Sequence, residues 1–409
     1  MLSPDVKQRL REGIEEFALP FDLGRWGEQA REAFTNLEPD GAVQALTPPS
    51  YASRSIVELA SCESPFKRTF GLDGGSTRPI HFANGTTLCA NQAVMVSEPP
   101  LELEGLPLEA FRTVALVTQS FAPSGGPRAA YLEEGLLGIW RIHLTRDYLR
   151  GEIDHVLKGL ADAASEARHA LRLAEHLNLG RDDMLFLDGN VFPIGLYYLV
   201  GARRSPEVDL TAFPGATRAL AQHLRLAETM VERGATYAGI NKTPQTSYLL
   251  GCLPEEGPWA DDRQLIRAVF HDLPKAELGW TNWFLQVRYR LPAPDRGASD
   301  LFRQVPFFKL ELPPEDYAIA YFFVSDPRTA GGAGSVLKVE VPWAILERHE
   351  PEKLQRVILA EIARGAAVPN VIRRADSRAR ITQEEREAFI RGSGLPPDLG
   401  YNQGRGEPW

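Results

Sequence analysis

The sequence predicts an α/β fold in which a mixed sheet is flanked by helices. Three strand-like segments come first, within residues 69–121, and helical and strand-like segments then alternate up to residue 241. Three antiparallel strands followed by helix, strand, helix and strand is the element order of a ribonuclease H-like domain. The sequence also predicts a helical arm before this core and further helices after it.

The first 60 residues are expected to form the N-terminal helical arm. Helical patterns cover residues 5–17 and 27–34, and the Pro/Ser stretch TPPSYAS (47–53) has the composition of a linker. We expect one main domain over residues 61–392 and a flexible tail over residues 393–409.

The core elements follow in order along the chain. Strands are expected at 69–72, 80–96 and 111–121, with Asn84-Gly85 as a hairpin turn. Helical patterns at 128–140, 151–177 and 210–234 accompany two short apolar runs, MLFLD (184–188) and TYAGIN (236–241). A continuous apolar run of this length suits a strand that is buried on both faces.

The C-terminal part is expected to begin with a helix after Asp261. Strands follow in WFLQVRYRL, FFKLEL, YAIAYFFV and SVLKVEVPW, and the glycine-rich loop SDPRTAGGAGS lacks the GK[ST] sequence of a P-loop. Helices are expected from about 351 to 375 and from 382 to 391. The second should begin with a capping box formed by Thr382 and Glu385.

Composition limits the classes of function. The 44% hydrophobic content of the 409 residues indicates a globular core, and the three cysteines lack metal-site spacing, which fits a reducing, cytoplasmic compartment. We expect neither a secretion signal nor a membrane span. The net charge of −9 means that any binding to nucleic acid must use a local basic surface or metal ions.

Two acids follow apolar strands in similar settings. Asp73 lies in FGLDGGSTRP, where Gly74 and Gly75 are expected to turn the chain as the strand ends, and Asp188 lies in FLDGN. If the two strands are neighbours, both carboxylates face one crevice. Like charges so close need a cation, and oxygen-only ligands favour Mg²⁺ or Mn²⁺.

A third acid is expected from the helix at 151–177. On a helical projection Glu166 falls inside the apolar arc and Glu175 lies at its edge, so Glu166 is the first candidate and Glu175 the second. The same projection places six polar residues toward water: Asp162, Ser165, Arg168, His169, Arg172 and His176. A glutamate facing a sheet must be paired or bound to metal.

Structural interpretations remain open beside these. Asp-Gly pairs are common in turns, and Glu166 could pair with an arginine. Lys242, after TYAGIN, is either a loop lysine or a cation that holds a phosphate.

These residues resemble the motifs of the NurA nuclease family. The matching segments are LDGGS, FLDGN, GINK (239–242), LKVEVPW and AVPNVIRRADSRARI, and the resemblance covers about residues 65–392. It implies a ribonuclease H-like core and Mn²⁺-dependent hydrolysis of DNA, with Mg²⁺ as the alternative ion. It also implies a homodimer docked on a hexameric HerA-type translocase, acting in 5′–3′ end processing during double-strand break repair.

The resemblance assigns roles residue by residue. Asp73 and Asp188 match the metal-binding acids of the family, Glu166 its helical glutamate and Lys242 its lysine. Two departures occur: a second glycine stands before Ser76, and Val368-Pro369 and Ala375-Asp376 replace tyrosine-proline and alanine-histidine. Asp376 is therefore either a further carboxylate or leaves the role of the histidine empty.

Two-metal-ion hydrolysis would need no nucleophilic side chain. Candidate phosphate contacts are Lys242, Ser76, Arg78, Arg373 and Arg374, although the arginine pair also suits a solvated helix face. Four aromatic residues are candidates for stacking on bases or for the core: Phe307, Phe308, Tyr321 and Phe322.

Two other functions compete with the nuclease. One is an actin-like kinase that uses DGGST as a phosphate loop, for which a second D-x-G-x-T hairpin would be expected. The other is a catalytically inactive scaffold for a DNA motor.

Overall fold

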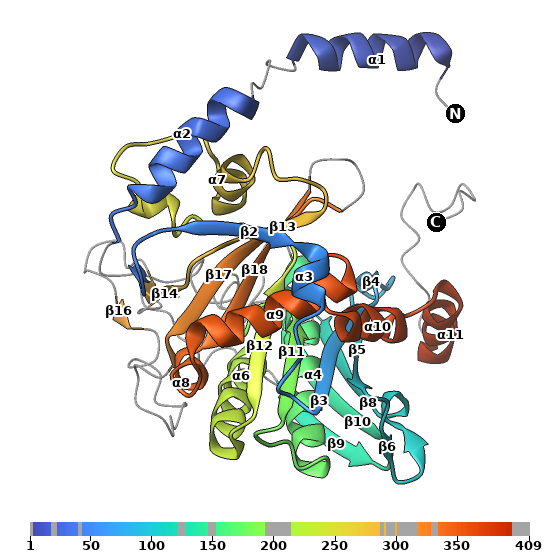
Figure 1. Ribbon diagram of the computed structural model, residues 1–409. Helices are drawn as coiled ribbons and strands as arrows, with labels where there is room; N and C mark the ends of the chain where they lie inside the picture. Colours follow the sequence, from blue (N-terminus) through green and yellow to red (C-terminus); the bar gives the residue numbers. More distant parts are fainter. Residues whose placement is uncertain are drawn as a thin grey trace.

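The structure is a computed structural model with a large sheet covered by helices on both faces (Figure 1). It describes residues 3–17, 23–39, 43–120, 128–145, 153–192, 214–286, 290–291, 299–300, 317–328 and 334–394. Within these ranges, fourteen strands form one sheet with the main order β1-β14-β17-β18-β12-β11-β3-β5-β8-β10-β9.

The centre of the sheet has the expected ribonuclease H-like topology. Strands β3 (Arg68–Ser76), β5 (Thr87–Glu98) and β8 (Arg112–Ser120) pair antiparallel. After α4 (Ile153–His176), β11 (Asp183–Asp188) pairs parallel with β3, and after α6 (Pro214–Arg233), β12 (Thr236–Asn241) pairs parallel with β11. Both apolar runs are buried along their length, as a doubly covered sheet requires.

The helix expected at 128–140 is wrong. Residues 128–134 form β9 (Arg128–Glu134) and residues 137–145 form β10 (Leu137–Thr145), a hairpin whose second strand runs parallel to β8 over nine residue pairs. The residues of RAAYLEEGLLGIWR favour a helix locally. Their strand conformation depends on β8, whose open edge supplies the pairing partner and which this stretch of sequence does not reveal. Tertiary pairing therefore overrides the local preference.

Strands β9 and β10 also bury part of the side of α4 that was expected to face water. Ser165, His169 and Arg172 are buried, whereas His176 is exposed as expected. The His169 ring meets the hydroxyl of Thr113 on β8 at 3.1 Å, and Arg172 contacts Glu133 of β9 at 2.7 Å. The extended sheet covers a helix face that a smaller sheet would have left in water.

The C-terminal half extends the other side of the sheet. β17 (Ile319–Asp326) and β18 (Ser335–Pro342) pair antiparallel and are almost wholly buried, with β18 joined to β12. Within the expected strand at 283–291 the structure has β14 (Phe284–Gln286) and β15 (Arg290–Leu291), and residues 287–289 and FFKLEL lie outside the described residues.

The long helix expected at 351–375 is two helices. α9 (Pro351–Gly365) ends where Ala366 and Ala367 take positive φ values of 56° and 82°, and α10 (Asn370–Ala379) begins after Pro369. The predicted capping box at the start of α11 (Gln383–Ser393) is confirmed. Figure 1 shows α9 and α10 on one face of the sheet and α4 and α6 on the other.

The N-terminal 60 residues do more than form a helical arm. α1 (Pro4–Phe17) and α2 (Leu23–Thr35) confirm the helical patterns, but β1 (Val43–Ala45) and β2 (Tyr51–Ser55) pair with β14 and with β13 (Glu277–Thr281). The TPPSYAS stretch thus runs into a sheet strand, because the edge of β13 offers unpaired backbone groups.

The remaining elements are short or follow the expected pattern. They are α3 (Ile56–Ala60), β4 (Ile80–His81), β6 (Glu102–Leu103), β7 (Leu106–Pro107), α7 (Asp262–Val269), β16 (Ser299–Asp300), α8 (Trp343–Leu346) and two 3₁₀ turns, Leu108–Ala110 and Leu250–Cys252. β4 and β5 form the hairpin predicted around Asn84-Gly85. None of the described helices is both long and apolar enough to span a membrane.

Candidate active site

The two strand acids lie side by side on neighbouring strands. β11 and β3 pair in parallel up to Leu187 and Leu72, so Asp188 and Asp73 follow at the next position of each strand and project from the same face. The two carboxyl groups are close enough to form a hydrogen bond when one of them is protonated. The two acids, each of which follows an apolar run in the sequence, are therefore neighbours in space.

The glycines after Asp73 do not turn the chain. β3 continues through Gly74 and Gly75 to Ser76, paired with β5, so Asp73 lies inside the strand and not at its end. The glycines instead permit close packing. A Cβ on Gly71 or Gly75 would overlap the backbone of α10, and one on Gly74 would lie 2.5 Å from Oε1 of Glu166.

Asp73 therefore lies between two points where α10 touches the sheet. Gly71 and Gly75 share its face of β3 and meet Val371 and Ala379, near the two ends of the helix. Asp376 lies between these two α10 residues and forms an ion pair with Arg380 at 2.8 Å. The close approach of α10 places a third carboxylate near the strand acids.

Burial and mutual repulsion perturb the two strand acids. Burial, followed by the charge of Asp188, raises the pKa of Asp73 to about 8, against the lowering effect of Lys242. Burial also raises the pKa of Asp188, although Lys242 opposes the shift. Asp73 is only 7% exposed. At neutral pH the pair can hold a shared proton, with Asp73 as donor, in the place where a cation would otherwise balance the charge.

Lys242 lies among these acids. It follows β12 and forms an ion pair with Asp188, which joins the ends of two neighbouring parallel strands. Burial lowers the pKa of Lys242, but the charges of Asp188, Asp73 and Asp376 outweigh it and raise the pKa overall. Lys242 is therefore a permanent cation at the carboxyl edge of the sheet.

Glu166 approaches Asp73 from the opposite side of β3. α4 packs on the face that Gly74 occupies, and burial, then the charges of Asp162, Asp73 and Asp188, raise the pKa of Glu166. It forms no ion pair with any described residue, so the arginine pairing left open above does not occur there. The described residues hold no group of three or more His, Cys, Asp or Glu side chains already arranged to hold a metal ion.

A polar cluster beside Glu166 was missed by the helical projection. Asp162, one turn earlier on α4, accepts a hydrogen bond from Nδ2 of Asn91 at 2.5 Å and pairs with Lys158 at 2.9 Å. Ser165 donates to the side-chain oxygen of Asn91. Ser76 hydrogen bonds to Asp162, which gives this serine a partner other than phosphate. The i, i+4 spacing of Asp162 and Glu166 was the available sequence signal.

Buried charged side chains support the loops that follow the site. Glu340 on β18 accepts a hydrogen bond from the backbone N–H of Val191 at 3.0 Å and pairs with Lys338 at 2.8 Å, which fixes the loop after Asp188. Asp262, at the start of α7, accepts backbone N–H bonds from Tyr248, Leu249 and Leu250 and a hydroxyl bond from Thr246, which fixes the loop after Lys242. Sequence reasoning found neither acid.

The other predicted residues are placed as follows. Glu175, the second candidate on α4, is exposed. Arg78 is exposed and lines a cavity of about 390 Å³ between β3 and the start of α11. Arg373 is exposed and donates to Asn370, whereas Arg374 is half-buried and donates to the backbone oxygen of Ser97.

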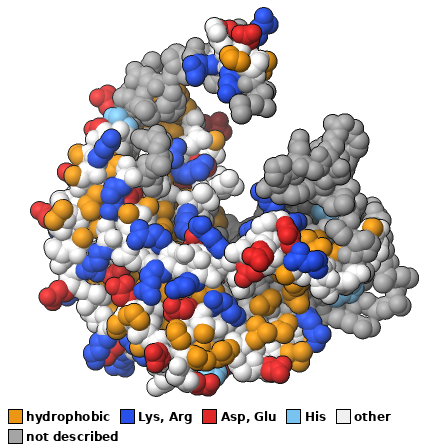
Figure 2. Space-filling model, turned by 90° about the vertical axis from the view of Figure 1, so that its right-hand side faces the viewer, with side chains coloured by type: hydrophobic (Ala, Val, Ile, Leu, Met, Phe, Trp, Pro, Cys, Tyr) orange, Lys and Arg blue, Asp and Glu red, His pale blue; other side chains and the backbone are white. Residues whose placement is uncertain are grey.

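The aromatic candidates divide into two pairs. Tyr321 and Phe322 are fully buried in β17, so they are core residues, and Phe307 and Phe308 lie outside the described residues. Figure 2 shows Lys and Arg mixed with Asp and Glu over the face that includes α10 and α11. Basic side chains are thus present on this face without forming a patch of one sign.

Comparison with known proteins identifies the family of this chain. The family model of the NurA domain matches residues 67–381. The chain belongs to the NurA family. This family of nucleases accounts for the order of the acidic motifs, and the matched range contains Asp73, Glu166, Asp188, Lys242 and Asp376.

Solved structures similar to this NurA-family chain share little sequence with it. The NurA nuclease from Sulfolobus solfataricus is 12% identical with a TM-score of 0.48, over 96% of this chain and 97% of that one. A NurA structure with dAMP and manganese is 11% identical with a TM-score of 0.46, over 96% and 98%. Endonuclease V from Bacillus subtilis has a TM-score of 0.30 at 11% identity, over 83% and 91%. No curated protein matches.

Proposed function

We propose that this NurA-family protein is a metal-dependent deoxyribonuclease that hydrolyses phosphodiester bonds with Mn²⁺, or alternatively Mg²⁺. The contact between the carboxyl groups of Asp73 and Asp188 is the main support. Two buried acids on adjacent strands with raised pKa values can both ionise only when a further cation balances their charge. Such a site suits a divalent cation with oxygen ligands.

Carboxylate oxygens are donors that this type of ion prefers. Asp73 and Asp188 would be ligands from one face of the sheet, and Glu166, which approaches from the other face at Gly74 and has no ion-pair partner among the described residues, would have to reach past β3 to complete the set. A divalent ion supplies electrophilic stabilisation to phosphate oxygens and activates water. Lys242 orients Asp188 and offers a positive charge to a phosphate, and Asp376 would contribute a further carboxylate from α10.

The wider role rests on the family resemblance. We propose that Lys242, Arg78, Arg373 and Arg374 contact DNA phosphates. In this proposal the chain works in the cytoplasm as a homodimer with a HerA-like hexameric translocase, in 5′–3′ end processing during double-strand break repair. Light scattering of the purified protein tests the dimer. Co-elution with a HerA-type ATPase tests the partnership.

The decisive experiment is cleavage of labelled single-stranded and duplex DNA by purified protein. Mn²⁺ should support cleavage, EDTA should abolish it, and Asp73→Asn and Asp188→Asn should each lower the rate by more than about 100-fold. Asp182→Asn is a matched control, because this exposed acid pairs with Lys67 at the amino end of β11. Absence of cleavage by folded wild-type protein with Mn²⁺ or Mg²⁺ would overturn the proposal.

The same assay distinguishes the two competing functions. A scaffold without activity would dock on a translocase but leave DNA intact under all metal conditions. The kinase alternative predicts ATP turnover by the isolated chain. It is not favoured, because the NurA family match includes both DGGST and the segment around Asp188.

A further inference from the structure

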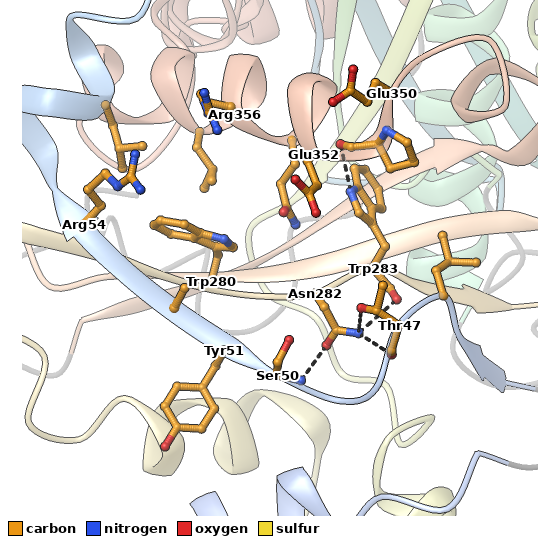
Figure 3. Close-up of a pocket in the computed structure, with 16 residues that line it drawn as sticks. Thr47, Ser50, Tyr51, Arg54, Trp280, Asn282, Trp283, Glu350, Glu352 and Arg356 are labelled. Atoms are coloured by element: carbon orange, nitrogen blue, oxygen red, sulfur yellow. Dashed lines mark hydrogen bonds between the residues drawn. The ribbon is translucent and has the colours of Figure 1, made fainter.

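A second cavity lies on the α9 side of the sheet, away from the strand acids. It has a volume of about 610 Å³ and lies between β2, the end of β13 and the beginning of α9 (Figure 3). Trp280 and Trp283 contribute rings to its lining, and Arg54 and Arg356 contribute cations, whereas the ring of Tyr51 packs on Phe34 and Phe270. This volume is within the range of small-molecule and nucleotide sites.

The two tryptophans have different surroundings. Trp283 is buried, donates its indole N–H to the backbone oxygen of Pro351 at 3.2 Å and packs on Phe322 with ring centroids 4.6 Å apart. Trp280 is half-exposed, and no described residue forms a ring contact or a hydrogen bond with its indole. Trp283 is therefore part of the wall, whereas the ring of Trp280 is available to a ligand.

The cavity is positively charged at the Trp280 end. Arg54 and Arg356 are exposed, and neither forms an ion pair with any described residue. Figure 3 shows both guanidinium groups on the Trp280 side, with the carboxyl groups of Glu350 and Glu352 toward Trp283. Glu350 is already paired with Lys353 at 2.5 Å. An aromatic face beside two guanidinium groups that form no ion pair with described residues suits a ring that carries phosphate.

Strand register relates this cavity to the candidate active site. Paired residues across four strands form one row, which consists of Asp188, Ile240, Val339 and Phe322. Trp280 pairs with Val324, two residues beyond Phe322, so Trp280 and Asp188 project from the same face of the sheet. Four strand spacings of about 4.8 Å separate β13 from β11, which gives roughly 19 Å.

We propose that this cavity binds a nucleotide of a single DNA strand whose scissile bond lies at the Asp73–Asp188 site. The base stacks on Trp280, and Arg54 and Arg356 bind the flanking phosphates. The inference rests on the proposed nuclease function. At about 3.4 Å per nucleotide the straight-line separation needs at least about six nucleotides, and because the row between the two positions is buried a strand must pass around it. A twelve-nucleotide strand, about twice that length, can reach both.

The test is binding of 5′-fluorescein-labelled dT₁₂ in EDTA, measured by fluorescence anisotropy at several salt concentrations. Arg54→Ala/Arg356→Ala should weaken binding about tenfold and reduce the salt slope by about 1.4, the value for two phosphate contacts on single-stranded DNA. The matched control is Arg141→Ala/Arg181→Ala, which removes two exposed arginines that form no ion pair with described residues. The control should bind as the wild type does.

The stacking partner is tested by Trp280→Ala and Trp280→Phe. Alanine should weaken binding five- to tenfold, and phenylalanine should recover most of it, because its ring still stacks. Melting temperatures identify a folding defect in either Trp280 variant. The arginine double variant tests the same subsite at exposed positions, where substitution leaves the fold intact. The proposal is overturned if the arginine double variant binds dT₁₂ with wild-type affinity and salt slope, or if wild-type protein fails to bind dT₁₂.

Binding without metal separates this inference from the proposed nuclease activity. If the protein binds dT₁₂ through Trp280 and the two arginines but never cleaves DNA, the subsite proposal is supported and the nuclease proposal is overturned. If the protein cleaves DNA but all variants bind dT₁₂ equally well, the nuclease proposal is supported and the subsite proposal is overturned.

Discussion

Gly74→Ala should reduce nuclease activity while leaving the fold intact. A Cβ at this position would lie 2.5 Å from Oε1 of Glu166 and 3.0 Å from the side-chain amide of Asn91. Ordinary van der Waals contact begins at 3.4 Å, so the carboxylate must move by about 0.9 Å. Displacement of a reacting or ligating group by about 1 Å costs on the order of 100-fold in rate.

The free energy of unfolding should change by no more than about 1 kcal/mol. The nearest atom belongs to the flexible end of a side chain, which can rotate, and alanine also restricts the unfolded chain. The assay is the Mn²⁺-dependent turnover rate on labelled DNA, with thermal melting of the same preparation. Glu166→Ala provides the matched background, in which Gly74→Ala should have almost no further effect, because the displaced carboxylate is absent.

Two results would refute this reasoning. Wild-type turnover by folded Gly74→Ala protein would show that the position of Glu166 does not matter for the reaction. An equal further loss in the Glu166→Ala background would show that the added methyl group acts through β3 or Asn91 instead.

Three further predictions concern stability. Gly75→Ala should lower the free energy of unfolding by about 1–3 kcal/mol, and the melting temperature by more than Gly74→Ala does, because the new Cβ overlaps backbone of α10. Gly251→Ala places its Cβ in open space and should leave the melting temperature unchanged. Burial lowers the pKa of His169 to about 3 and of His223 to about 4, so only the unfolded chain gains these protons as pH falls below 6.5. Denaturant titrations should show that each of these histidines lowers the free energy of unfolding by about 2 kcal/mol at pH 5, and His169→Gln should remove the contribution of His169. Asp262→Ala should cost about 3 kcal/mol or more by denaturant titration, since four donors lose their acceptor, and an unchanged midpoint would contradict this.

Local patterns predicted the elements that hold the site. The apolar runs before Asp188 and Lys242 became β11 and β12, and the apolar arc of the helix at 151–177 became the buried stripe of α4. A strand buried on both faces and a long amphipathic helix both leave a signal within a few residues. That signal was enough to place Asp73, Asp188 and Glu166 in one region.

Patterns that depend on a distant partner were misread. The helical interpretation of 128–140 failed because β9 and β10 exist through the edge of β8, and the polar side of α4 then became buried. The same limitation concealed Asp162, Glu340 and Asp262, whose hydrogen-bond partners come from other elements. A polar residue shows whether it is buried only when its neighbours are known.

The sequence by itself determined the α/β class, the two acids that follow apolar runs and the glutamate inside the apolar arc of the helix, because hydrophobic periodicity is a local property. The pairing of the two strands, which makes the acids neighbours, came from the tertiary structure. Tertiary structure alone decided how the chain uses the glycines of LDGGS. Gly74 and Gly75 belong to a continuous strand, and their missing side chains admit Glu166 from one face and α10 from the other. Contact across a sheet depends on which helix lies on each face, and no short stretch of sequence specifies that.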